Sequence, residues 1–364
     1  MKLKFDRARE EDLPTLNDLY NRVFDANRSM DQFKWEFREG PYGPATQYVL
    51  RDEKGEARAH WGVLPNYFVC GNRSLKAGKV ENTMIDPDLR GQGHYGKFER
   101  ESIKQVWNEN YDAIWNSLTT ASGLRKRTGF SMVGNLVYLF RPLRGRGANL
   151  SYYLQKTFRR VLGDDFTSGL TKRVTSITPD EKPGYEARQV SVSHRSISGE
   201  ESIRVMEQLS SGKQGLVTMM RDAEYMRWRF LNNPHLSFQF EFLEDEKDQG
   251  VLIWHQKREE IVIDDFWWSG IMTPELIEAV YFSVRKTWLK QKGAHLVSFL
   301  TLEHSEFYLM LRKSGFVPVG NNKWVAPERH FLIYPNPSIE SDLQEKLMRS
   351  EHWMISNIIT EGIR

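Results

Sequence analysis

Two short motifs each occur twice in this chain, in the same order and at similar separations. Trp-x-Phe-x-x-x-Pro begins at Trp35 and again at Trp228, and Gly-Phe-x-x-Val-Gly begins at Gly129 and again at Gly315. One shared motif can arise by chance, whereas an ordered pair of motifs indicates two copies of one structural unit. A chain of 364 residues also exceeds the usual size of one compact domain. The sequence therefore predicts two related domains.

The positions of the repeats predict where these domains begin and end. Residues 1–143 form the first copy and residues 188–336 the second. Residues 144–187 are interpreted as a linker with one bridging helix, because apolar residues recur there at helical spacing. Residues 337–364 are expected to form a helical tail with Ser338 as its N-cap.

The apolar pattern of the first copy predicts an α/β fold with a mixed sheet. Alternating apolar residues indicate strands, and apolar residues three and four positions apart indicate helices. Strands are expected at 2–5, 47–51, 57–69, 79–85, 113–118 and 133–140, with a break at 64–66, and helices at 12–24, 93–110 and 121–128. Strands and helices in this order favour a mixed sheet covered by helices.

The composition excludes several classes of protein. Hydrophobic residues make up 40% of the chain and charged residues 27%, which is typical of a globular protein. The net charge of +3 gives no reason to expect a nucleic-acid or membrane partner. Cys70 is the only cysteine, so no intramolecular disulfide can form. Because the first residues also lack an apolar leader, we expect a cytoplasmic protein; the sequence leaves its oligomeric state open.

One segment, residues 80–97, has a pattern suited to binding a phosphate. A strand runs into the glycine-rich turn Arg90-Gly91-Gln92-Gly93, and an amphipathic helix follows. At such a junction several backbone N–H groups have no partner, and the helix dipole adds partial positive charge. Glycines let a diphosphate approach the backbone closely, and an arginine adds a charge-assisted hydrogen bond. The segment therefore predicts a diphosphate site.

The same segment resembles motif A of the GNAT superfamily of acyl-CoA-dependent N-acyltransferases. That motif reads Arg/Gln-x-x-Gly-x-Gly/Ala after a strand; Arg90 and Gly93 match it, whereas Tyr95 replaces the final small residue and Gly96 lies beside it. The resemblance covers the first copy well and the second more faintly. It implies two tandem GNAT-like domains, the second degenerate. It also implies an acyl-CoA donor, with acetyl-CoA the expected one, and no metal.

The resemblance also implies which residues contact the coenzyme. The splayed end of strand 79–85 would offer backbone groups to the pantetheine arm, and the glycine-rich turn would hold the diphosphate. Asn116 is expected to bond the coenzyme arm, and Arg125 to meet its phosphates. The predicted coenzyme-binding residues are Thr83, Met84, Ile85, Arg90, Gly91, Gln92, Gly93, His94, Tyr95, Gly96, Asn116 and Arg125.

Direct attack of an amine on a thioester requires a base, because the attacking ammonium must lose a proton. Glu81 is the predicted catalytic base, since on a regular strand its side chain shares a face with Thr83 and Ile85, close to the expected thioester. A cross-strand partner or a solvated face is the alternative for Glu81. Asp86 and His94 flank the phosphate loop and are weaker candidates.

The acid that protonates the leaving thiolate is not evident from the sequence. Many superfamily members use a tyrosine in the helix before the Gly-Phe pair, but residues 122–128 contain no tyrosine. A thiol is a fair leaving group near its own pKa, so a dedicated acid is not strictly required.

The second copy has no counterpart of the phosphate-binding turn. Residues 261–269 run into Gly270 without an Arg-x-x-Gly pattern, so this copy is predicted to have lost coenzyme binding. Its Asp265, Trp267 and Trp268 are expected to help hold an acceptor in a cleft between the domains. A buried structural face is the alternative interpretation of these three residues.

The function that these observations favour is transfer of an acyl group from coenzyme A to a primary amine of a small molecule, with an amino sugar as one candidate. A catalytically silent coenzyme-binding module is an alternative, which the missing tyrosine favours. A Fem-type peptidyltransferase, which takes its donor from aminoacyl-tRNA, is another; the glycine-rich motif and the low net charge argue against it.

Overall fold

The computed structural model of this protein describes residues 2–118, 122–143, 191–209, 216–291, 293–318 and 329–359. The elements of the first half are β1 (Lys4–Arg7), a 3₁₀ turn (Glu10–Asp12), α1 (Leu13–Phe24), α2 (Met30–Phe37), β2 (Thr46–Arg51), β3 (Ala57–Cys70), β4 (Arg73–Ile85), a 3₁₀ turn (Pro87–Leu89), α3 (His94–Trp107), β5 (Ala113–Leu118), α4 (Ser122–Arg127) and β6 (Ser131–Pro142). The predicted linker, residues 144–187, lies outside the described residues.

The second half repeats this order of elements. They are β7 (Ser193–Ser196), α7 (Gly199–Leu209), β8 (Val217–Met219), α8 (Ala223–Met226), the π-helical turn η4 (Arg227–Leu231), β9 (Gln239–Glu244), β10 (Gln249–Lys257), β11 (Glu260–Trp268), α9 (Pro274–Leu289), β12 (Leu296–Leu302), α10 (Glu306–Lys313), β13 (Val317–Pro318) and β14 (Arg329–Pro335). The chain then continues through α11 (Ser341–Met348), a 3₁₀ turn (Ser350–His352) and the 3₁₀ turn η6 (Asn357–Ile359).

Two local predictions are wrong in detail. Strand β3 is not broken at Pro65, which pairs with Gly78 of β4. On the other side of β3, pairing with β2 extends only to Val63, which lies opposite Thr46. The missing N–H group of Pro65 therefore leaves no sheet hydrogen bond unmade on that side. Ser338 does not cap the C-terminal helix: α11 begins at Ser341, and the Ser338 hydroxyl instead donates to Asn336 Oδ1 (2.9 Å) in the preceding turn.

Helix α2 is an element for which the sequence analysis gave no range. Ser29 and Gln32 form a reciprocal capping box: Ser29 Oγ accepts from the Gln32 N–H (3.2 Å), and Gln32 Oε1 accepts from the Ser29 N–H (2.9 Å). The Ser-x-x-Gln pattern before an apolar run is the sequence signature of such a helix start.

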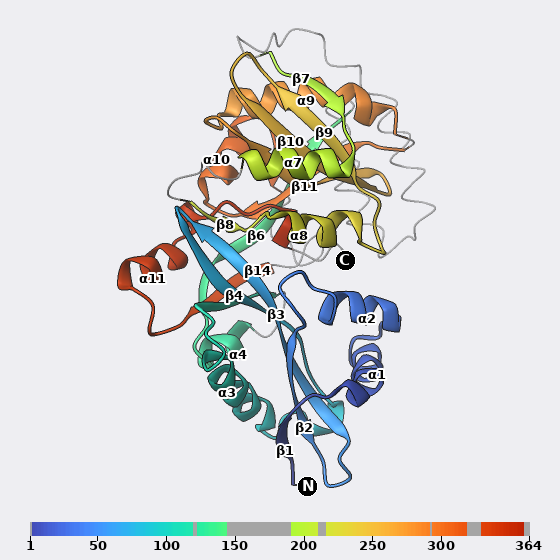
Figure 1. Cartoon of the computed structure of the whole chain (residues 1–364), viewed down its shortest axis with the longest axis vertical. Helices are drawn as coiled ribbons and strands as arrows, with labels where there is room; N and C mark the ends of the chain where they lie inside the picture. The colour runs from blue at the N-terminus through green and yellow to red at the C-terminus, as the bar shows by residue number, and fades with distance from the viewer. Residues whose placement is uncertain are drawn as a thin grey trace.

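The described strands form one 14-stranded sheet. Twelve of them lie in the order β1-β2-β3-β4-β5-β14-β6-β12-β11-β10-β9-β7, while β13 pairs with β6 and β8 pairs with β3. Helices α1 and α2 pack on one face of its first half, where Leu13, Leu16 and Phe33 meet Val49 and Leu64. Helix α3 packs on the opposite face (Figure 1). Helices therefore cover both faces of this part of the sheet, as the predicted α/β fold requires.

The two halves exchange strands at the centre of this sheet (Figure 1). Strand β14, which comes from the end of the second half, lies between β5 and β6 of the first. The last part of β6 in turn pairs with β12 of the second half, from Leu136↔Leu302 to Pro142↔Leu296. The first Gly-Phe repeat leads directly into β6, and the second leads into β13, which also pairs with β6. The residue limits of the two domains stay a prediction, and the sheet runs continuously across them.

The two copies of the Trp-x-Phe motif also contact each other. The rings of Trp35, on α2, and Trp228, on η4, stack with centroids 4.7 Å apart, and Trp228 Nε1 donates to the Trp35 carbonyl (3.2 Å). The repeat therefore marks the contact between the halves. Among the described residues, no helix has the length and apolar character required to cross a bilayer.

Candidate active site

Strands β4 and β5 separate to form a fork. They pair in parallel only from Ala77↔Ala113 to Lys79↔Trp115. Beyond that point both strands continue without pairing with each other. At the base of the fork the Asn116 side-chain amide nitrogen donates to the Val80 carbonyl. The separation leaves backbone groups of both strands without sheet partners. This is the splayed strand end that the sequence predicts.

Strand β4 also carries a bulge at this place. Its register against β3 shifts between His60 and Gly62, and Asn82 has a left-handed φ of 49°. The prediction that Glu81 and Thr83 follow one another on a regular strand is therefore wrong, because the bulge interrupts the alternation of side chains. Asparagine adopts a left-handed φ more readily than most residues. The asparagine at position 82 was therefore the only local indication of the bulge in the sequence.

His60 holds the bulge in place. Its Nδ1 lies 2.7 Å from the Asn82 carbonyl, which can only accept, so Nδ1 carries the proton; Nε2 contacts the Gln47 side-chain amide (2.9 Å). Burial lowers the pKa of His60 to about 4. The hydrogen bond to Asn82 acts in the opposite direction, and the Arg28 charge adds to the lowering. The imidazole is thus neutral at pH 7 and serves to position the backbone.

This burial predicts a loss of stability in mild acid. An unfolded histidine binds a proton below about pH 6.5, whereas folded His60 does so only near pH 4. Stability is therefore fully present above pH 6.5 and falls by up to about 3 kcal/mol as the pH drops to 4. Urea unfolding of the wild type and of His60→Gln between pH 4 and pH 7.5 measures the difference. His94→Gln is the control, and equal pH slopes in wild type and His60→Gln would contradict the assignment.

The start of α3 has the geometry of an anion site. Gly91 and Gly93 both have φ = 77°, with open space where a Cβ would lie, and Gly93 is the N-cap of the helix. Only glycine adopts this conformation without strain. No side chain caps the helix, so the N–H groups of its first turn are available to a ligand.

A cleft of about 1170 Å³ joins this helix start to the fork. Most of the predicted coenzyme-binding residues line it: Thr83, Met84, Ile85, Arg90, Gly91, Gly93, Tyr95, Gly96, Asn116 and Arg125. Glu81 lines it as well. Gln92 and His94 are not among the lining residues, and the Gln92 side chain donates instead to the Asp88 carbonyl (2.8 Å).

Arg125 is the least suited of these residues to meet a phosphate. It is 2% exposed, forms an ion pair with the buried Glu99, and lies over the Phe130 ring. Burial lowers its pKa. In the described part of the chain the exposed arginines at the cleft, Arg90, Arg100 and Arg127, have no ion pair. Arg100 and Arg127 were missed because nothing in the sequence shows which helix positions face the cleft.

Two buried amides also point to a polar ligand. Among the described residues, Asn82 Nδ2 and Asn116 Oδ1 have no hydrogen-bond partner, although the two side chains are only 7% and 3% exposed and both line the cleft. Buried polar atoms in native proteins are nearly always satisfied. One free donor and one free acceptor beside the fork therefore suit a ligand with amide groups.

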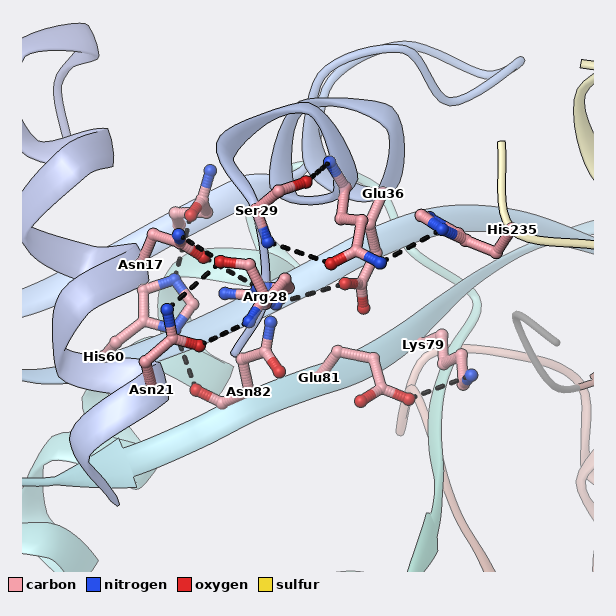
Figure 2. A network of polar contacts seen from close by, with 12 residues as sticks. Asn17, Asn21, Arg28, Ser29, Glu36, His60, Lys79, Glu81, Asn82 and His235 are labelled. Atoms are coloured by element: carbon pink, nitrogen blue, oxygen red, sulfur yellow. Dashed lines mark hydrogen bonds and ion pairs between the residues drawn. The ribbon is translucent and has the colours of Figure 1, made fainter. Parts of the chain in front are cut away.

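Glu81 is buried at the inner end of the cleft. Its Oε1 lies 2.9 Å from Lys79 Nζ, and both side chains project from β4, below Arg28 and Glu36 in Figure 2. Arg28 pairs with Glu36 (3.2 Å) and donates from Nε to Asn17 Oδ1 (2.8 Å). Burial lowers the pKa of Arg28, and the Glu36 and Glu81 charges oppose this. The carboxylate of Glu81 therefore belongs to a buried group of charges.

The other candidate bases are placed differently. The Asp86 carboxylate is held by Arg22 and by Arg58, each 3.2 Å from Oδ2. His94 opens α3 and does not line the cleft. The described residues contain no cluster of three or more His, Cys, Asp or Glu side chains arranged to hold a metal.

The matching place in the second half is built differently. Strand β11 also has a bulge, between the pairs Ile253↔Asp265 and Trp254↔Ile263, and separates from β12 after Ile263. However, Thr273 caps α9 by accepting from the Leu276 N–H (3.2 Å), and Pro274 has no N–H. The start of α9 therefore offers fewer groups to an anion than the start of α3.

The three predicted acceptor residues lie in the interior and not in an open cleft. Trp267 and Trp268 are each 2% exposed and pack in separate hydrophobic clusters. Asp265 is fully buried in a bidentate pair with Arg221 (2.7 and 3.0 Å). The expectation that they border an open cleft is corrected, because a β-strand with both faces covered buries both sets of side chains. Their contact with an acceptor stays a prediction.

Comparisons with known proteins support the fold. No protein-family model and no curated relative matches the chain. A GCN5-related N-acetyltransferase from Anabaena variabilis has a similar structure, with TM-score 0.58 and 9% identity, over 91% of this chain and 72% of that one. A second one, from Kribbella flavida, gives 0.56 and 13% over 91% and 71%. Saccharomyces cerevisiae N-myristoyltransferase with bound myristoyl-CoA gives 0.56 and 12% over 97% and 85%.

These identities are low, so the likenesses show the fold alone. The chain has the fold of the GNAT superfamily, as motif A predicts, and the similarity extends over both halves. The mixed α/β class predicted from the sequence is confirmed.

Proposed function

We propose that this protein is an acyl-CoA-dependent N-acyltransferase that moves an acyl group from coenzyme A to a primary amine of a small molecule, with an amino sugar as one candidate acceptor. The observation that carries the proposal is the cleft at the β4–β5 fork. It joins backbone groups without sheet partners, one free amide donor and one free amide acceptor to a helix start with two left-handed glycines and no side-chain cap.

The cleft residues fit each part of an acyl-CoA. The N–H groups at the start of α3 suit the diphosphate, and Arg90, Arg100 and Arg127 suit its charges. Asn82 and Asn116 suit the amides of the pantetheine arm. Val23, Phe24 and Leu124 give part of the wall an apolar surface. The acyl chain carried by the donor is expected to be acetyl.

Glu81 is the proposed base. Its carboxylate would take the proton from the acceptor ammonium, so that the free amine attacks the thioester carbonyl. A backbone N–H at the fork would stabilise the negative charge on the carbonyl oxygen. As the thiolate leaves, the nitrogen of the new amide loses its second proton to water. The thiolate takes up a proton from solvent, because helix α4 has no tyrosine to supply one.

The direct test is to mix the protein with CoA thioesters from acetyl to myristoyl and a set of primary amines, and to measure release of free thiol. The proposal expects release that depends on both substrates and an amide product of the matching mass. Tight CoA binding with no thiol release from any pair would instead support a silent coenzyme-binding module.

The three exposed arginines of the cleft lead to a quantitative prediction. Replacing Arg90, Arg100 or Arg127 by Met removes one charge beside the phosphates and should weaken CoA binding by about three- to tenfold each, since exposed charge pairs contribute modestly. Calorimetry at low salt measures the effect. Lys97→Met, which removes an exposed charge of α3 that does not line the cleft, is the control. An equal effect of all four substitutions would place the phosphates elsewhere.

A further inference from the structure

The fork in the second half is filled by the C-terminal segment of the chain, residues 353–359. Strands β11 and β12 pair only as far as Ile263↔Phe299, and η6 packs against both strands beyond that point. In the first half the corresponding fork opens onto the large cleft. Figure 1 shows this end of the chain at the junction of the two halves.

The segment is fixed by specific polar contacts. Ser356 Oγ donates to Asp265 Oδ1 (2.7 Å), and Asn357 Nδ2 donates to Asp264 Oδ1 (2.8 Å). The carbonyl of Ile358 accepts from Tyr225 Oη (3.1 Å). The described residues of the segment, from Trp353 to Ile359, are all 5% exposed or less. The segment is therefore as deeply buried as the strands that it covers.

Its last described residue, Ile359, borders a second cavity that lies between the two halves. Residues of the first half lining this cavity include Glu36, Lys79 and Trp115, and those of the second half include Tyr225 and Trp228. The free volume is about 20 Å³, which is room for one group the size of a water molecule. An amino group is of that size.

The cavity and the donor cleft meet at one ion pair. Lys79 lines the cavity and Glu81 lines the cleft, and their charged atoms are 2.9 Å apart. A group held in the cavity beside Lys79 is therefore next to the carboxylate that we have proposed as the base. The ion pair that contains the proposed base therefore borders both cavities.

We infer that this cavity receives the amine of the acceptor, and that Ile359 sets its width so that only a primary amine on an unbranched carbon stem enters. The inference rests on the proposed function and narrows it. An amino group on a ring carbon is branched at that carbon, so such amino sugars would be poor acceptors, whereas an aminoalkyl group would be a good one.

The test compares two isoleucines of the same segment. Ile358 and Ile359 are both buried, at 1% and 3% exposure, but only Ile359 lines the cavity. The probes are 1-aminobutane and 2-aminobutane, with the acyl-CoA that the wild type uses best. One misplaced methyl group typically changes kcat/KM by 10–200-fold. We therefore expect the wild type to favour 1-aminobutane by about tenfold or more. Ile359→Ala should reduce this preference several-fold, and Ile358→Ala should leave it unchanged.

Two readouts separate this inference from the proposed function. Calorimetry with each amine in the presence of CoA measures the same preference as binding, so it needs no turnover. Amine selectivity without thiol release would support the cavity and count against catalysis. A wild type that takes both amines equally, or equal changes in the two alanine variants, would overturn the inference. Should either alanine variant fail to fold, Ile358→Val and Ile359→Val give the same comparison with one methyl group removed.

Discussion

Gly93→Asp should abolish coenzyme A binding, with at least a hundredfold loss of affinity. The substitution places a side chain where φ is +77° and the surrounding space is open to the anion site. A negative charge there would face the diphosphate, and like charges in contact cost several kcal/mol. Calorimetry of CoA binding to the purified variant measures the loss, with the melting temperature as the check on folding.

Gly293→Asp is the matched control for this prediction. Gly293 has φ = +79° and open space at its Cβ position, in the turn after α9 of the second half. The backbone strain is therefore the same, but no anion site is present. CoA affinity should be unchanged in this variant. Unchanged affinity in Gly93→Asp would refute the proposed phosphate site. A second CoA site in the wild type, with an affinity that Gly93→Asp does not change, would show that the second half also holds the coenzyme.

Glu81→Gln should lower kcat by about 10²–10⁴-fold while CoA affinity changes little, because a base contributes to the transition state and hardly to donor binding. The amide keeps the size of the side chain and can still contact Lys79, which limits structural effects. Steady-state kinetics with a fixed amine across pH 6–9 measure the effect on kcat, and calorimetry measures the affinity.

Asp86→Asn tests the main alternative base in the same way. Its carboxylate is already held by Arg22 and Arg58, so we expect a change in stability and a nearly normal kcat. A near wild-type rate for Glu81→Gln over the whole pH range would return Glu81 to a structural role as the partner of Lys79. Water would then be the proton acceptor.

The parts of the site that the sequence predicts are those fixed by neighbouring residues. Gly91 and Gly93 indicate a left-handed turn directly, since few other residues adopt it. The strand before them and the helix after them follow from local apolar periodicity. The capping box at Ser29 is equally local, so the Ser-x-x-Gln pattern could have indicated α2, although the apolar periodicity alone did not.

The parts that the sequence does not predict depend on pairing between distant segments. The bulge at Asn82 requires His60 on the neighbouring strand, and the alternation of side chains gives no sign of it. The burial of Trp267 and Trp268 depends on elements that cover both faces of β11, including the C-terminal segment. The place of β14 beside β5 depends on a strand more than two hundred positions later in the chain.

The exchange of β6 and β14 has a consequence for how each half of the chain can change. Each half contributes a strand that completes the hydrogen bonding of the other, so neither half could fold alone without leaving a sheet edge exposed. The start of α9 can therefore differ from the start of α3, but the strands of both halves must remain. A requirement for activity in one half therefore also preserves the strands of the other half. Cutting the chain between the two halves would be expected to yield fragments that aggregate or reassociate.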